Sequence, residues 1–341
     1  MFGLWWKNMP AHILGVDGGQ TSTKMVIATQ NGRIIWYAEV ASAFSGLDGD
    51  FSGSLENRLK EILVQALSAG SWDNTAFEMA VLGMSGAEPG SPLIEVFQRA
   101  VEGAVQARRC LVVHDAVTNL LGASAGQPGI VVIAGGGAVA YGFTEGGRSW
   151  ASGGWGYAVG DEGSGYNIGR TAINRVFRAL DGRDPPTQLA DPLLRYFDVS
   201  GPVALKYAIL SGGIGFQDIA GLPPLVAQIA AGGDATAQRL LQEAGQHLAE
   251  AAVAVARALE MQESPVNVYF TGGLLHETHY LVPSFQRAAR QALPQASFRQ
   301  PAFEPVVGTL FLAFQELGRP IDRFLLSALS EGWKAKQGDG S

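Results

Sequence analysis

The fold is decided near the amino terminus by residues 13–24, which read ILGVDGGQTSTK. An apolar run from His12 to Val16 ends at Asp17, a polar glycine turn follows, and a second apolar run covers residues 25–28. The dipeptide Asn31-Gly32, which is typical of tight hairpins, then precedes the β-branched and aromatic residues 33–40. We therefore predict an antiparallel meander of three strands whose first turn is glycine-rich and polar.

The same pattern returns about 118 residues later, counting from Asp17 to Gly135. The apolar run 130–134 leads into the turn Gly135-Gly136-Gly137, a strand is expected over 138–143, and a second turn follows at 145–147. A repeated strand–turn–strand–turn arrangement indicates two related halves. The fold class we expect is α/β, with a cleft between the two halves.

The remaining elements follow from hydrophobic periodicity. Helices are expected over 55–67, 93–105, 117–125, 236–260, 280–292 and 323–333, and buried strands over 79–84, 111–113 and 266–270. After Gly169 the chain is predicted to be mostly helical.

Composition excludes several classes of protein. The chain has 341 residues, of which 47% are hydrophobic and 16% charged, so it is long enough for about two domains and too apolar to be disordered. A net charge of −7 without a Lys/Arg cluster argues against a nucleic-acid partner. We expect no membrane helix, because no run of 18 apolar residues occurs. The single cysteine, Cys110, excludes an internal disulfide and suits a reducing cytoplasm.

The first glycine turn has the chemistry of a phosphate site. Gly18 and Gly19 allow backbone N–H groups to approach an anion, and Thr21 and Lys24 add a hydroxyl and a positive charge. Asp17, at the end of the strand, is a candidate to hold Mg²⁺ through water. Taken alone, the segment is better explained as a polar hairpin without a ligand, because a single glycine pair is a weak signal.

The turn at residues 135–137 is a second candidate for phosphate binding. Three glycines between two strands cost backbone entropy, which a phosphate passing over the turn would justify. An ordinary tight turn is the alternative. Two such hairpins in one chain favour phosphate binding.

Residues 153–165, GGWGYAVGDEGSG, combine six glycines with aromatic and acidic side chains. A ring such as that of Trp155 can pack on the C–H face of a sugar, and the carboxylates of Asp161 and Glu162 can accept hydrogen bonds from its hydroxyls. The alternative is a structured loop in which Asp161 caps the following helix.

Two shorter motifs follow strands. His114-Asp115 closes one predicted strand and opens a helix, where a carboxylate can accept a proton from an attacking hydroxyl or simply cap the helix. Thr271-Gly272-Gly273 follows the strand 266–270 and could form a flat backbone surface for a nucleotide.

Taken in order, these segments resemble the sugar kinases of the actin/hexokinase/Hsp70 superfamily. The resemblance is strongest to the N-acetylglucosamine kinase and glucosamine kinase group of the BadF/BadG/BcrA/BcrD ATPase family, and it runs from about Ile13 to about Gly308. It implies two RNase-H-like, actin-like ATPase domains around an interdomain cleft. We expect an extension over 1–10, a first domain over 11–116 that residues 322–335 could join, a second over 117–321, and a disordered tail over 336–341.

The resemblance also implies roles for individual residues. The phosphates of ATP would contact Gly18, Gly19, Gln20, Thr21, Lys24 and Gly135 to Gly137, and the adenosine would lie on Gly272 and Gly273. Asp17 would hold Mg²⁺ through water, and Asp115 would be the general base. The sugar would contact Ser45, Ser85, Gly86, Asp115, Gly154, Trp155, Asp161 and Glu162. The partners are then a small sugar and ATP, and a homodimer is compatible with the family.

The sequence departs from the family pattern in two places. The second phosphate hairpin usually reads Gly-Thr-Gly-Ser, but here Gly136 and Ala138 remove both hydroxyls. A hydrogen bond to a charged group is worth about 1.5–3 kcal/mol, so turnover could fall roughly tenfold or more. In addition, residues 41–46 lack the asparagine that binds the N-acetyl group, which favours free glucosamine or another hexose.

The expected function is therefore phosphoryl transfer from Mg-ATP to the 6-hydroxyl of a hexosamine. One alternative is an ATPase of the BadF type, against which the single cysteine argues because those proteins share an iron–sulfur cluster between subunits. The other is a catalytically weakened protein that senses a sugar or a nucleotide. The identity of the sugar, the phosphate donor and the oligomeric state stay open at this stage.

Overall fold

The computed structural model describes residues 12–44, 51–274 and 279–338, with no account of the side chains of 337 and 338. The predicted extension over 1–10, Ser45 and the last three residues of the predicted tail lie outside this part of the chain. The chain divides into two compact units. Unit 1 comprises residues 1–127 and 301–341, and unit 2 comprises residues 128–300.

Unit 1 is built on a mixed sheet that contains the predicted meander. Strands β1 (His12–Gly18), β2 (Ser22–Thr29) and β3 (Ile34–Ala41) are antiparallel neighbours, which confirms the meander. The sheet continues from β1 to β4 (Ala76–Met84), which pairs in parallel with β1 and also with β5 (Gln106–Ala107) and β6 (Cys110–His114).

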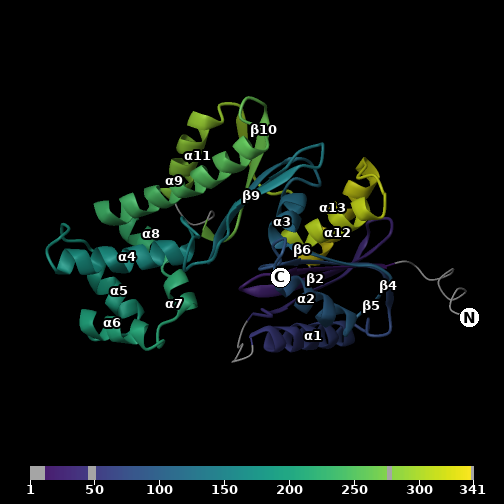
Figure 1. Ribbon diagram of the computed structural model, residues 1–341, viewed down its shortest axis with the longest axis horizontal. Helices are drawn as coiled ribbons and strands as arrows, with labels where there is room; N and C mark the ends of the chain where they lie inside the picture. Colours follow the sequence, from purple (N-terminus) through teal and green to yellow (C-terminus); the bar gives the residue numbers. More distant parts are fainter. Residues whose placement is uncertain (1–11, 45–50, 275–278, 339–341) are drawn as a thin grey trace, which may run out of the picture. The chain divides into compact units, whose positions relative to one another are not determined.

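Side-chain alternation along β1 assigns the two faces of this sheet. Leu14 and Val16 point into a core formed with helices α1 (Phe51–Ala69) and α2 (Leu93–Glu102), which lie side by side in Figure 1. On the opposite face, a Cβ atom at Gly15 would lie 1.9 Å from the hydroxyl of Thr309, so a helix packs directly on the strand. That helix is α12 (Pro305–Glu316), which also packs on α3 (Asp115–Ala123).

Unit 2 repeats the strand order of unit 1. Its sheet runs β11-β10-β7-β8-β9, where β7 (Gly129–Ala134), β8 (Ala138–Phe143) and β9 (Ser149–Gly153) are antiparallel neighbours. Strand β10 (Val266–Thr271) pairs in parallel with β7, as β4 does with β1, and β11 (Ala296–Arg299) pairs in parallel with β10. The internal repeat expected from the two glycine hairpins is therefore a repeat of topology.

Most of unit 2 outside the sheet is helical, as predicted. Two long helices, α4 (Gly165–Leu180) and α9 (Ala235–Ala258), contribute to its core together with α11 (Leu281–Ala292), which lies alongside α9 in Figure 1. The shorter helices are α5 (Ala190–Tyr196), α6 (Pro202–Leu210), α7 (Phe216–Ala220) and α8 (Pro223–Ala231). Within the described segments, no helix is both long and apolar enough to cross a membrane.

The limits of the units differ from the domain limits expected from the sequence. Residues 117–127 and 301–321, which we expected in the second domain, lie in unit 1. The reason is the close pairing of α3 with α12 and of α12 with β1 and β4. Helix α13 (Arg323–Gly338) also lies in unit 1 and packs on β3, and it extends into the segment 336–341 that we expected to be disordered.

Candidate active site

The carboxyl ends of three parallel strands bring the predicted residues of unit 1 to one edge of its sheet. Gly18 of β1 is in register with Met84 of β4, and Met84 is in register with His114 of β6. Asp17, Ser85 and Asp115 therefore lie at the same end of adjacent strands. The N–H of Ser85 donates to the carbonyl of Gly18 over 3.1 Å, which ties the loop containing Gly86 to the first hairpin.

The first hairpin is closed by its own backbone and held by β3. The N–H of Gly19 donates to the carbonyl of Ser22 over 3.1 Å, and the hydroxyl of Ser42 donates to the carbonyl of Gly19 over 2.7 Å. Gln20 and Thr21 are exposed at the tip. A Cβ atom at Gly18 would lie 2.4 Å from the Cε of Met84, so a larger residue there would need the end of this flexible side chain to move. The turn thus presents backbone and hydroxyl groups to solvent.

Lys24 is surrounded by carboxylates. It lies opposite Asp17 in the β1–β2 pairing and opposite Glu39 in the β2–β3 pairing, and its Nζ is 2.7 Å from Oε2 of Glu304. Burial lowers the pKa of Lys24, but the hydrogen bond to Glu304 and the nearby negative charges outweigh it and raise the pKa above its usual value. Sequence reasoning missed Glu304 and Glu39, because Glu304 is 280 residues away along the chain and neither belongs to a glycine motif.

The carboxyl group of Asp17 is strongly perturbed. Burial is the largest cause, followed by the charge of Asp115, and together with Glu304 and Glu39 they raise the pKa of Asp17 to about 7 against the opposing effect of Lys24. Crowded carboxylates of this kind are relieved by a cation. The described residues contain no cluster of three or more His, Cys, Asp or Glu able to ligate a metal directly. The crowding of Asp17 by other carboxylates is the observation that fits a nearby cation.

Asp115 begins α3, and His114 caps that helix. The N–H of Ala116 donates to Nδ1 of His114 over 3.2 Å, so the histidine provides the cap that we had considered for Asp115. The side chain of Asp115 is 20% exposed, and its Oδ1 lies 3.3 Å from Nδ1 of His114. Burial raises the pKa of Asp115 despite the lowering effects of His114 and of the Ala116 N–H.

The second glycine hairpin, in unit 2, is fastened to the start of α4. The N–H groups of Gly165 and Tyr166 donate to the carbonyls of Gly135 and Gly136 over 2.8 and 3.3 Å. A Cβ atom at Gly136 would lie 3.3 Å from the ring of Phe216. At Gly136, where the family usually has threonine, the ring of Phe216 occupies the space in which a side chain would lie.

Asp161 links the second hairpin to the glycine-rich loop. It is 6% exposed, its Oδ1 accepts the N–H of Gly156 over 3.3 Å, and a Cβ atom at Gly137 would lie 2.9 Å from its Oδ2. Burial raises the pKa of Asp161, and the N–H groups of Gly156 and Ala138 lower it in part. The cap of α4 is Ser164 and not Asp161, because the Ser164 hydroxyl accepts the N–H of Asn167 over 3.1 Å.

The loop between β9 and α4 needs its glycines and exposes its aromatic side chains. Gly153, Gly154, Gly156 and Gly163 have φ values between +75° and +86°, a conformation that side chains disfavour. Trp155 is 78% exposed and Glu162 is also exposed. Tyr157 packs against Tyr166 and Phe216, with ring centroids 4.9 and 5.0 Å apart. A buried carboxylate and an exposed indole therefore occupy one loop.

The third glycine motif of unit 2 packs against the second hairpin. Gly272 has a φ of +96°, and a Cβ atom there would lie 2.3 Å from the carbonyl oxygen of Ala134, the residue before Gly135. Gly273 is exposed, and nothing lies within 4 Å of where its Cβ would be. Thr271 is buried, and its hydroxyl has no hydrogen-bond partner within the described residues. The motif thus offers an open stretch of backbone beside the hairpin.

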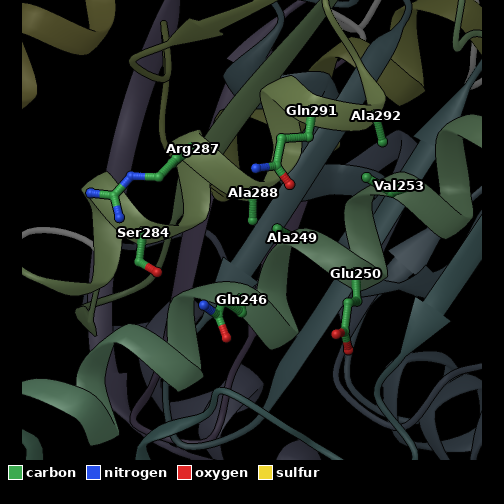
Figure 2. A pocket seen from close by; sticks show the side chains of 9 residues that line it. All are labelled: Gln246, Ala249, Glu250, Val253, Ser284, Arg287, Ala288, Gln291 and Ala292. Atoms are coloured by element: carbon green, nitrogen blue, oxygen red, sulfur yellow. The ribbon is translucent and has the colours of Figure 1, made fainter.

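A cavity of about 440 Å³ lies elsewhere in unit 2, between α9 and α11 (Figure 2). Its lining includes Gln246 and Glu250 from α9 and Ser284, Arg287 and Gln291 from α11. None of the residues predicted from the sequence to bind sugar or nucleotide lines it. This cavity is therefore separate from the candidate residues.

The structure sorts the candidate residues into two sets. Unit 1 brings together Asp17, the hairpin 18–21, Lys24, Ser85, Gly86 and Asp115. Unit 2 brings together Gly135 to Gly137, Asp161 and Gly272, with Gly154, Trp155 and Glu162 in the attached loop and Gly273 next to Gly272. The topology, two sheets with the same strand order and helices packed on them, defines a two-domain α/β protein of the actin-like ATPase class.

The chain belongs to the BadF/BadG/BcrA/BcrD ATPase family, whose model matches residues 14–313. It is 28% identical over 305 residues to the N-acetylmuramic acid/N-acetylglucosamine kinase of Clostridium acetobutylicum, covering 89% of this chain and 99% of that protein. It is 27% identical to the N-acetyl-D-glucosamine kinase of Dictyostelium discoideum, covering 88% and 97%. A solved structure from Chromobacterium violaceum, described as a candidate N-acetylglucosamine kinase, is 28% identical with a TM-score of 0.69 and covers 89% and 98%. The expected family and fold are thereby confirmed.

Proposed function

We propose that this protein is an ATP-dependent kinase that phosphorylates a hexosamine at its 6-hydroxyl, with Asp115 as the general base. The observation that carries the proposal is the arrangement in unit 1. Asp17 lies at the carboxyl end of β1 and Asp115 directly follows β6, and both strands pair in parallel with β4. The glycine hairpin with Lys24 lies directly beside Asp17. Similarity to kinases of N-acetylglucosamine over nearly their whole length supports the same reaction class.

In the proposed reaction the hydroxyl oxygen of the sugar attacks the terminal phosphorus of ATP. The bond between that phosphorus and the bridging oxygen breaks, ADP leaves, and Asp115 takes the hydroxyl proton. Transfer of this kind depends mainly on positioning and charge neutralisation. The N–H groups of the hairpin 18–21 and the ammonium of Lys24 would bind phosphate oxygens. Mg²⁺, held through water by Asp17, would neutralise phosphate charge.

The candidate residues of unit 2 have proposed roles of their own. The backbone of Gly135 to Gly137 would bind phosphate without the hydroxyls usual in the family, and Gly272 and Gly273 would border the adenosine. Trp155 would pack on the sugar ring, with Gly154 and Glu162 beside it. Asp161 already accepts backbone N–H groups of Gly156 and Ala138, so we propose that it holds the sugar loop in place as well as contacting the sugar.

The decisive experiment measures ADP release with ATP and a panel of sugars. We expect turnover with glucosamine, N-acetylglucosamine or both, and little ADP release without sugar. Hydrolysis that needs no sugar would favour an ATPase of the BadF type, and tight sugar binding without ADP release would favour a sensor. The missing N-acetyl-binding asparagine leads us to expect glucosamine to be at least as good a substrate as N-acetylglucosamine.

Replacing Asp115 tests the proposed base. We expect Asp115→Asn to lower kcat at least a hundredfold, the low end for loss of a general base, while ATP and sugar still bind by calorimetry. Asp73→Asn, which changes an exposed carboxylate after α1 in the same way, is the matched control and should leave kcat unchanged. Near-normal kcat in Asp115→Asn would remove Asp115 from this role.

A further inference from the structure

His114 lies between two carboxylates, and one of them belongs to Asp115. Its Nε2 is 3.3 Å from Oε1 of Glu88, and its Nδ1 is 3.3 Å from Oδ1 of Asp115. The side chains of His114 and Asp115 are 15% and 20% exposed, whereas that of Glu88 is 48% exposed. In the sequence, His114 stands out only as the neighbour of the candidate base in the motif His114-Asp115.

The geometry distinguishes the two protonation states of the imidazole. In the neutral ring Nδ1 accepts the N–H of Ala116, so the proton is on Nε2 and faces Glu88, and a lone pair faces the carboxylate of Asp115. In the imidazolium both nitrogens donate, one to Glu88 and one to Asp115, and the N–H of Ala116 then has the carboxylate of Asp115 as its acceptor in place of Nδ1. The charged ring donates a hydrogen bond to both carboxylates, whereas the neutral ring donates only to that of Glu88.

The charges around this pair favour the imidazolium. Burial lowers the pKa of His114, but the hydrogen bond to Glu88 and the charges of Asp115 and Glu88 outweigh it and raise the pKa above 6.5. The pKa of Glu88 is correspondingly lowered, chiefly by its hydrogen bond to His114. Asp115 also interacts electrostatically with Asp17, whose charge is itself opposed by Lys24. His114 is thus the basic side chain that borders the carboxylate of Asp115, and its surroundings favour the protonated form.

We propose that His114 is a positioning residue that orients the Asp115 carboxylate through Oδ1, leaves Oδ2 to the acceptor hydroxyl, and keeps the carboxylate ionised, with Glu88 as its anchor. This inference rests on the proposed function in assigning a catalytic consequence to the pair. The pairing of His114 with Asp115 and Glu88 does not depend on the reaction and can be tested without it.

The first test is a proton NMR titration of the imidazole in the full chain. The His114 signal is identified by its loss in His114→Asn, a variant in which asparagine can still cap α3. We expect His114 to titrate above pH 6.5, and to titrate at lower pH in Asp115→Asn and in Glu88→Gln. The signal of His247, which is 44% exposed and 3.4 Å from Glu250 in unit 2, is the internal control and should be the same in all variants. An unshifted His114 signal in both variants would overturn the pairing.

The second test is the pH dependence of kcat. Because the imidazolium stabilises ionised Asp115, His114→Asn should move the acid limb of the profile to higher pH and lower the ratio of kcat at pH 6 to kcat at pH 8 by roughly three- to tenfold. A purely structural cap would not move that limb, and His247→Asn should leave the profile unchanged. A profile of His114→Asn that overlays the wild type would refute the catalytic part of the inference. If no sugar supports turnover, the proposed function fails, whereas the titration still decides the pairing.

Discussion

Asp17 illustrates how a site residue can destabilise the fold that carries it. Its carboxylate is buried and lies near three other carboxylates. Burial and these negative charges raise its pKa from 3.8 to about 7 in the folded chain. Between these two pH values the folded protein holds a proton that the unfolded chain has released. The contribution of Asp17 to the free energy of unfolding therefore falls as the pH rises from about 4 to 7, and this contribution is lowest above pH 7.

We expect Asp17→Asn to stabilise the protein at pH 8 and to do so much less at pH 5. The full shift corresponds to at most about 4 kcal/mol. Because Asp17 keeps partial contact with solvent, we expect about 1–2 kcal/mol. Urea unfolding at both pH values measures the difference, with Asp73→Asn as the control. If Asp17→Asn were no more stable than the wild type at pH 8, crowding of the Asp17 carboxylate would not destabilise the fold. We also expect the Asp17→Asn variant to lose kinase turnover.

At the scale of elements, helix α12 is the main difference between the expected and the observed structure. Its sequence, PVVGTLFLAFQE, is apolar on all sides and shows no amphipathic periodicity, so no helix was predicted there. The structure explains this composition, because the helix packs on the sheet through Thr309 and on α3 through Gly308 and is buried from Val306 to Phe311. A helix buried between two layers has no solvent face for a sequence pattern to reveal.

The contact between α12 and α3 depends on a glycine. A Cβ atom at Gly308 would lie 1.8 Å from the carbonyl oxygen of Thr118 and 2.7 Å from the backbone N of Gly122, and neither backbone atom can move freely. We expect Gly308→Ala to lower the free energy of unfolding by about 2 kcal/mol, after allowing for the better helix propensity of alanine. Gly146→Ala lies in an exposed turn, where the Cβ atom would meet only the hydroxyl of Thr144 at an ordinary 3.8 Å, and should change the free energy of unfolding by less than about 0.5 kcal/mol. Chemical denaturation measures the free energy of unfolding of both variants and of the wild type. If Gly308→Ala were as stable as Gly146→Ala, the close packing of α12 on α3 would be contradicted.

At the scale of the whole molecule, the chain leaves unit 1 after Gln127 and returns to it at Pro301. Unit 2 is therefore one continuous segment with a complete hydrophobic core of its own. Unit 1 is made from two segments, because α12 and α13 must come back to cover the sheet formed by the first 114 residues.

We therefore expect residues 128–300, expressed alone, to fold and to unfold cooperatively when followed by circular dichroism. The segment 117–321, which matches the domain limits expected from the sequence, should aggregate. It carries α12 without the sheet of unit 1 that α12 covers, so an apolar surface is left exposed. If residues 117–321 unfolded cooperatively and residues 128–300 aggregated, the limits 128–300 of unit 2 would be wrong.

Local signals in the sequence were enough to predict the α/β fold class, the first strand meander, the repeated strand–turn–strand–turn pattern and the glycine motifs. Those features rest on local signals, namely alternating apolar residues, glycines at turns and acidic residues at strand ends. Only the tertiary structure decided that Glu304 meets Lys24, that His114 and Glu88 border Asp115, and that α12 belongs to unit 1. These contacts join residues from separate elements, some of them far apart in the chain, and local patterns carry no information about which distant side chains meet.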